Sequence, residues 1–125
     1  MTKHILPVLI LINLLGMATV PLQATSADED VPETISYLIE YVRTSNCTFV
    51  RNGAVHTPEE AADHMQDKYE HFQKKIHTPE DFIRLAASKS LLSGKPYMVK
   101  PKDGKQMLCS VWLTKALEEY RASKE

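Results

Sequence analysis

Histidine and cysteine side chains are the groups in this chain that could serve as bases, nucleophiles or metal ligands. His64 and His71 are seven residues apart, two turns along one face of a predicted helix, with Asp67 between them. The ring nitrogens of such a pair lie roughly 10 Å apart by helical rise, too far to share one ion, and the usual helical signature places its histidines at i and i+4. We therefore predict no metal site and no cofactor.

Motifs for nucleophilic catalysis and for phosphate binding are missing from the sequence. There is no Gly-x-Ser-x-Gly string, and neither Gly94-Lys95 nor Gly104-Lys105 is followed by Ser or Thr, as a Walker-type loop requires. Paired carboxylates occur at predicted helix starts and in Glu118-Glu119, where helix charge and solvation account for them. These patterns favour a protein that is not an enzyme, without excluding catalysis.

The first 27 residues have the order of a secretory signal peptide. Lys3 precedes an almost uninterrupted apolar run from Ile5 to Val20, and small residues follow at Ala24 and Ala27. The run is shorter than the roughly 20 residues that a permanent transmembrane helix needs, so we predict cleavage after Ala24 or Ala27, with an uncleaved anchor as the alternative. The expected product is one exported domain, residues 28–125, without a membrane span, in the periplasm or secreted.

Both cysteines, Cys47 and Cys109, lie in the predicted exported part. In an oxidising compartment an isolated pair is most simply a disulfide, which would here close a loop of about 62 residues and contribute roughly 4 kcal/mol. The alternative is Cys47 as a nucleophile beside His56 or His64, which requires a free thiolate next to a base. No spacing supports that alternative, so a disulfide is predicted.

The charge balance excludes one broad class of function. The predicted exported part, without Lys3, has 14 Lys and Arg against 16 Asp and Glu, a net charge of −2. A generalised nucleic-acid-binding surface needs a surplus of Lys and Arg to displace counterions. We therefore expect no nucleic-acid partner.

Helical periodicity dominates the exported part. Ile35, Leu38, Ile39 and Val42 follow the i, i+3, i+4, i+7 spacing of an amphipathic helix. Spacing and helix-start signals predict four helices: Glu33–Ser45, Pro58 to about Lys75, Pro79 to about Ser88, and Met107 to about Arg121.

Two of the predicted helices begin with the same string, His-Thr-Pro-Glu, at residues 56–59 and 77–80. In each, threonine is the expected N-cap, proline the first helical residue, and the acids face the positive end of the helix dipole. Thr57 with Glu60 and Thr78 with Asp81 are spaced as capping boxes, although Asp is the weaker partner of the two acids.

Short strands are predicted between the helices. Cys47–Val50 is rich in β-forming residues and precedes Asn52-Gly53, a strong hairpin signal because both residues tolerate positive φ. The second strand would be Ala54–His56, unless a tight turn leads directly into the next helix. Tyr97–Lys100 is a further candidate strand. The predicted fold class is mainly α: a small four-helix domain with one or two short β strands.

Residues 47–100 contain a set of strings that together form a recognisable pattern. They are Phe49-Val50-Arg51-Asn52-Gly53, His56-Thr57, Glu60-Ala61, His64, Lys68, Thr78 to Ile83, Ser90, Ser93-Gly94-Lys95-Pro96-Tyr97 and Val99-Lys100. These strings resemble a family of small exported proteobacterial proteins that is catalogued only as a domain of unknown function. The resemblance covers about half of the chain. It implies family membership but no activity, and the two cysteines do not belong to it.

The resemblance concentrates interest on polar groups of a turn, a helix face and a loop. If these groups converge, they form a cationic pocket with hydroxyl donors, suited to a ligand that carries a carboxylate or a phosphate. An anionic cell-wall fragment or another envelope protein is the expected partner. The predicted ligand-binding residues are Arg51, Asn52, His64, Lys68, Ser90, Ser93, Lys95 and Tyr97.

Two other interpretations of these residues stay open. A small hydrolase would use His64 as base, Ser90 or Ser93 as nucleophile, and Arg51 as electrophilic partner. In a purely structural envelope protein, Asn52-Gly53 would only make the turn, Arg51 would cap a helix, His64 would be an interior hydrogen-bonded residue, and Ser93-Gly94 would end a helix. A Ser–His hydrogen bond in an open cleft would favour the hydrolase.

Overall fold

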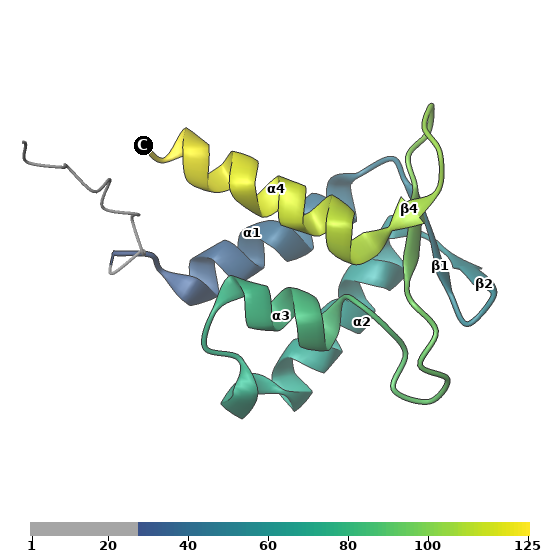
Figure 1. Cartoon of the computed structure of the whole chain (residues 1–125), viewed down its shortest axis with the longest axis horizontal. Coiled ribbons are helices and arrows are strands. Elements are labelled where there is room, and N and C mark those ends of the chain that lie inside the picture. The colour runs from purple at the N-terminus through teal and green to yellow at the C-terminus, as the bar shows by residue number, and fades with distance from the viewer. Residues whose placement is uncertain (1–27) are drawn as a thin grey trace, which may run out of the picture.

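Four α-helices and one small antiparallel sheet make up residues 28–125, the part of the chain that the computed structural model describes (Figure 1). The mainly α fold class is confirmed. The predicted signal peptide lies outside the described residues. The elements are α1 (Val31–Thr44), β1 (Thr48–Arg51), β2 (Ala54–His56), α2 (Pro58–His71), the 3₁₀ turn η1 (Gln73–Lys75), α3 (Pro79–Ala86), β3 (Met98–Lys100), β4 (Met107–Leu108) and α4 (Cys109–Ser123).

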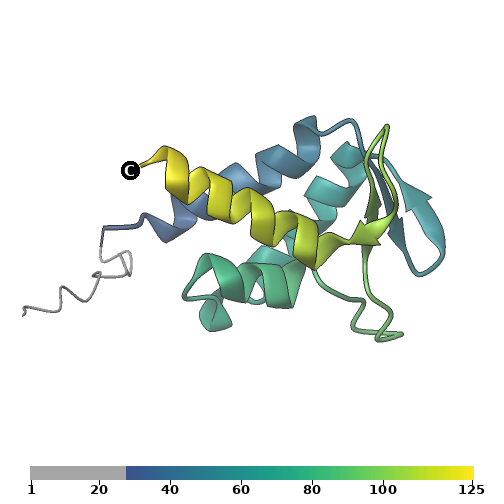
Figure 2. The same cartoon turned by 45° about the horizontal axis from the view of Figure 1, so that its top comes forward.

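The sheet lies at one end of the helical layer and has the strand order β2-β1-β3-β4 (Figures 1 and 2). The hairpin of β1 and β2 is present, and it turns at Asn52 and Gly53, whose φ angles are +52° and +76°. Two successive positive φ angles match the right-handed twist of a tight hairpin. Arg51 and Ala54 therefore pair directly across the turn.

One or two short strands were expected, and the sheet has four, because β3 and β4 join the hairpin of β1 and β2. Phe49 of β1 pairs with Val99 of β3, and Val99 also pairs with Met107 of β4. Met107 and Leu108 were predicted as the start of the last helix, but their backbone is extended and α4 begins at Cys109. Their apolar side chains fit a helical spacing as well, so the periodicity could not reveal a pairing with a strand far along the chain.

The helix starts follow the threonine signals, with one difference in the caps. Thr78 and Asp81 form a complete capping box, in which each side chain accepts from the other residue's backbone N–H. Thr57 accepts from the backbone N–H of Glu60, but the Glu60 carboxylate contacts the His56 ring at 3.0 Å instead of closing the box. Asp81, the weaker capping partner on sequence grounds, thus makes the complete box, because the Glu60 carboxylate bonds to the His56 ring instead.

Two helices are shorter than expected at their C-terminal ends. α2 ends at His71 rather than near Lys75, and the chain continues through η1. α3 ends at Ala86, where the Ala87 N–H closes the last turn on Ile83, and Ser88 already bonds back to the Ile83 carbonyl. Helix ends depend on where the chain must turn toward its next packing partner, which propensity alone does not set.

The hydrophobic core lies among the four helices and one face of the sheet. Leu38 of α1, Phe82 of α3 and Leu113 of α4 have no exposed surface, and Val99 brings β3 into the same cluster. The ring of Tyr69 packs edge-on against Phe82, with ring centroids 5.9 Å apart. No helix in this described part of the chain is both long and apolar enough to cross a bilayer.

The predicted disulfide is wrong: Cys47 and Cys109 are both free thiols. Cys109 is fully buried at the start of α4, where its small side chain packs as part of the core. Burial, with a smaller contribution from Cys47, raises the pKa of its thiol to about 12. The domain is therefore held by core packing, and Cys109 is a protonated structural residue rather than a nucleophile.

The position of Phe82 predicts a large loss of stability on truncation. Phe82→Ala removes a side chain with no exposed surface and leaves a cavity between α2 and α3, so the free energy of unfolding should fall by about 3–5 kcal/mol. Urea denaturation followed by circular dichroism measures this change. Leu92→Ala is the control, because Leu92 is 97% exposed and its loss should change stability by less than about 0.5 kcal/mol. Equal losses in the two variants would contradict the described core.

Candidate functional site

Three segments that are distant in the sequence meet at an open groove of about 550 Å³ beside α2. β1 and its turn contribute Arg51 and Asn52, α2 contributes one face, and the loop before β3 contributes the opposite wall. The groove contains six of the eight residues predicted as ligand-binding: Arg51, Asn52, His64, Lys68, Ser90 and Tyr97.

The two remaining predicted residues do not line this groove. Ser93 donates through its hydroxyl to the Asn52 side-chain oxygen, so it adjoins the groove and supports it. Lys95 takes part through its backbone only: its N–H donates to the Ser93 hydroxyl and its carbonyl accepts from Ser90. Its side chain is exposed on the loop, because the turn at Gly94, with φ +69°, redirects the chain there.

Tyr97 links the two basic residues of α2. The Lys68 ammonium donates to the Tyr97 hydroxyl at 3.1 Å, and the same hydroxyl lies 3.1 Å from Nε2 of His64. An ammonium can only donate, so the tyrosine oxygen accepts from Lys68 and its own proton is free to bond to His64. One arrangement that satisfies both bonds has the neutral His64 accepting at Nε2 with its proton on Nδ1.

The surroundings of His64 hold it in that neutral form. Burial lowers the pKa of its imidazole to about 4, and the positive charges of Arg51 and Lys68 act in the same direction, against a smaller opposing effect of Asp67. Burial also lowers the pKa of Lys68 and raises that of Tyr97. At neutral pH the groove therefore contains a neutral imidazole hydrogen-bonded to a protonated phenol.

Lys68 connects α2 to the loop before β3. It is 7% exposed, and its ammonium donates to the backbone carbonyl of Lys89 at 3.0 Å as well as to Tyr97. Lys89 pairs with Pro96 at the base of the loop, so this bond fixes the loop against the helix. An ammonium has three N–H groups, and the third has no partner within residues 28–125.

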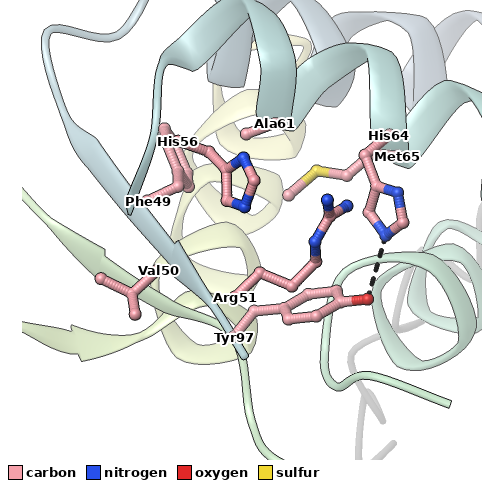
Figure 3. Close-up of a pocket in the computed structure, with 8 residues that line it drawn as sticks. All are labelled: Phe49, Val50, Arg51, His56, Ala61, His64, Met65 and Tyr97. Atoms are coloured by element: carbon pink, nitrogen blue, oxygen red, sulfur yellow. Dashed lines mark hydrogen bonds between the residues drawn. The ribbon is translucent and has the colours of Figure 1, made fainter. Parts of the chain in front are cut away.

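Arg51 is a cation without a protein partner in the described part of the chain. Its guanidinium makes no hydrogen bond or ion pair there, and no buried nitrogen of residues 28–125 lacks a partner, so the guanidinium nitrogens reach solvent. Figure 3 shows the side chain pointing from β1 toward α2, between the rings of His56 and His64. Arg51, His64 and Tyr97 also line a second, smaller hollow of about 20 Å³, which has room for about one water molecule.

The serine hydroxyls are used by the loop itself. Ser90 is 5% exposed, and its oxygen accepts from the Asn52 amide at 3.2 Å and from the backbone N–H of Leu92 at 3.3 Å. Ser93 accepts from Lys95 and donates to Asn52. Within residues 28–125 neither serine bonds to His64, whose Nε2 faces Tyr97. The observation that would have favoured a hydrolase is therefore lacking in the described chain.

Some groove residues were not among those predicted. Asp67, His71 and Phe72 follow His64 at i+3, i+7 and i+8 on α2 and at its end, so helical geometry would have placed them on the same face. Leu91 and Leu92 have no such signal, because exposed leucines in a loop follow no spacing. No group of three or more His, Cys, Asp or Glu side chains in residues 28–125 is arranged to hold a metal ion.

A mainly α domain with a four-stranded antiparallel sheet and a cationic groove is thus the class of protein that the structure defines. The chain belongs to a protein family of unknown function, DUF5329, which it matches over residues 29–121. This match confirms the expected membership in a family of unknown function. The chain is also 36% identical over 81 residues to the uncharacterized protein YfeK of Salmonella typhimurium, an alignment that covers 65% of this chain and 68% of that protein. No solved structure matches it.

The low pKa of His64 predicts a specific loss of stability in acid. The imidazole titrates near pH 4 in the folded chain and near 6.5 when unfolded, so between these values only the unfolded state takes up the proton. The free energy of unfolding is therefore unaffected by His64 above about pH 6.5. It falls as the pH drops toward 4, by roughly 2 kcal/mol after allowance for partial solvent exposure.

The measurement is urea denaturation at a series of pH values, for the wild type and His64→Gln. Carboxylates titrate in the same range, so the difference between the two profiles isolates His64. The fall in the free energy of unfolding between pH 6.5 and pH 4 should be smaller in His64→Gln than in the wild type. A direct NMR titration of the His64 ring should give a midpoint near 4; a midpoint near 6.5 would show that the ring is not held neutral.

Proposed function

We propose that this chain is a binding module that holds a small anionic group, a carboxylate or a phosphate, in the groove at Arg51. One observation carries the proposal: the Arg51 guanidinium has no hydrogen-bond or ion-pair partner within residues 28–125, although its nitrogens reach solvent beside other donors. The guanidinium of a structural arginine normally donates hydrogen bonds to carboxylates or backbone carbonyls, as that of Arg43 does to Glu40 and Asp63.

The donors around Arg51 suit an anion in charge and in geometry. The guanidinium presents its five N–H groups in a planar fork that matches two oxygens of one carboxylate or phosphate. The third N–H of Lys68 and the second N–H of the Asn52 amide add donors from two other segments. Lys68 is desolvated, which strengthens its attraction to an opposite charge.

The leader at residues 1–27 supports export, and we propose the periplasm, or the space outside the cell, as the place of action. An anionic cell-wall fragment would then be a ligand of the right charge. An acidic side chain of another envelope protein is the second candidate, because it would present the same carboxylate. For a hydrolase, in contrast, the described groove offers no activated serine.

Replacement of Arg51 tests the proposal directly. Arg51→Gln should weaken binding of acetate, inorganic phosphate and N-acetylmuramic acid by about 10- to 100-fold for whichever of them the wild type binds, the loss of about 1.5–3 kcal/mol expected for hydrogen bonds to a charged group. Chemical-shift titration by NMR measures affinities in this weak range and reports which amides move.

The matched control is Arg84→Gln on α3. Arg84 is paired with Asp81 at 3.1 Å on an exposed surface away from the groove, so its replacement should leave the affinity for each anion unchanged. The proposal fails if none of the three anions shifts the amides of the groove, or if the Arg51 and Arg84 variants bind equally well.

A further inference from the structure

The loop that forms one wall of the groove exposes two adjacent leucines. Leu92 is 97% exposed, the most exposed large hydrophobic residue of the described chain, and Leu91 is 64% exposed. Both line the same groove as Arg51. Single exposed apolar side chains are common on protein surfaces, but here two adjacent leucines and the ring of Phe72 line the same groove as Arg51. These three side chains are called the apolar margin.

The loop is held in this conformation by specific bonds. The Ser90 hydroxyl accepts from the backbone N–H of Leu92, the Ser90 carbonyl accepts from Gly94, and the Asn52 side chain bonds to both Ser90 and Ser93. The turn of the β1–β2 hairpin therefore fixes the loop that carries the leucines. The apolar margin and the cation at Arg51 are set relative to each other before any ligand arrives.

The face of α2 in the groove carries polar side chains as far as His71 and ends at the ring of Phe72. His64 and Lys68 lie beside Arg51, and Phe72 follows one turn beyond Lys68. The distance from His64 to Phe72 along the helix is about 12 Å, at 1.5 Å per residue. A ligand that follows this face meets positive charge at one end and hydrocarbon at the other.

The charge of the groove matches a single negative charge. Among the Lys, Arg, Asp and Glu side chains of the groove, Arg51 and Lys68 contribute two positive charges and Asp67 one negative charge, and the His64 ring beside Arg51 is held neutral by its surroundings. A carboxylate neutralises the remaining charge of +1 and fits the guanidinium fork with both oxygens. A phosphate monoester carries closer to two negative charges and would leave one of them uncompensated beside Asp67.

We infer that the ligand is a single-chain amphiphile, with a carboxylate bound at Arg51 and an alkyl chain along Phe72, Leu91 and Leu92 in the groove. This inference rests on the proposed function, because it names the class of anion that the same groove binds. Burial of the alkyl chain against the leucines supplies the affinity that a lone carboxylate lacks, and the cation supplies the selectivity for an acid.

The experiment compares decanoate with butyrate by isothermal titration calorimetry and NMR on the full exported chain. The two acids share a head group, so their ratio of affinities isolates the alkyl chain. Decanoate should bind at least tenfold more tightly than butyrate. In the double variant Leu91→Ser/Leu92→Ser the ratio should fall well below tenfold, because decanoate loses its leucine contacts while Phe72 remains, and in Arg51→Gln both acids should bind more weakly.

The control variant is Leu108→Ser/Val111→Ser, which removes two other exposed apolar side chains that do not line the groove and should keep the tenfold ratio. Equal affinities for butyrate and decanoate in the wild type would overturn the amphiphile inference and leave the anion site intact. If neither acid binds, both the amphiphile inference and the proposed carboxylate site at Arg51 are overturned. Tighter binding of decyl phosphate, or equal binding of the uncharged decyl maltoside, would overturn the carboxylate assignment.

Discussion

The bond network of the Lys68 ammonium is the interaction on which the site depends. Lys68 is only 7% exposed, and burying its charge without hydrogen-bond partners would cost free energy of folding. Its partners are a backbone carbonyl and a tyrosine hydroxyl rather than a carboxylate. The Lys68 ammonium thereby connects α2 to both ends of the loop before β3, at Lys89 and at Tyr97. The charge is solvated by dipoles but not neutralised, so it continues to lower the pKa of His64 and to attract an anion.

Features of the fold that have a local cause could be predicted from the sequence. Thr57 and Thr78 cap the helices that follow them, and Asn52-Gly53 makes the hairpin, because each signal acts within a few residues. The pairing of Met107 with Val99 depends on segments that meet only in the folded chain, so the sequence suggested helix there instead. The disulfide was inferred from the expected compartment alone, and compartment does not determine whether Cys109 packs as a thiol.

The candidate site was predictable to the extent that its members are polar and lie in turns. Arg51, Asn52, His64, Lys68, Ser90 and Tyr97 do converge, whereas Lys95 leaves the site because the positive φ of Gly94 turns the loop away. The leucines could not be found, since their exposure results from the Asn52–Ser90–Ser93 bonds across 38 and 41 residues of sequence. Sequence indicates which residue types are present, but long-range hydrogen bonds decide which of them face the same groove.

A scaffold role explains most of these residues, but it does not explain Arg51. Asn52 and Ser90 brace the hairpin against the loop, and His64 is hydrogen-bonded to Tyr97, as a structural interpretation requires. Arg51 was expected to cap a helix under that interpretation, and within the described chain its guanidinium bonds to nothing. Its charge disfavours the charged form of the buried Lys68 nearby, so it does not stabilise that ammonium. A cation that does not stabilise its surroundings is most simply explained by an anion that binds there.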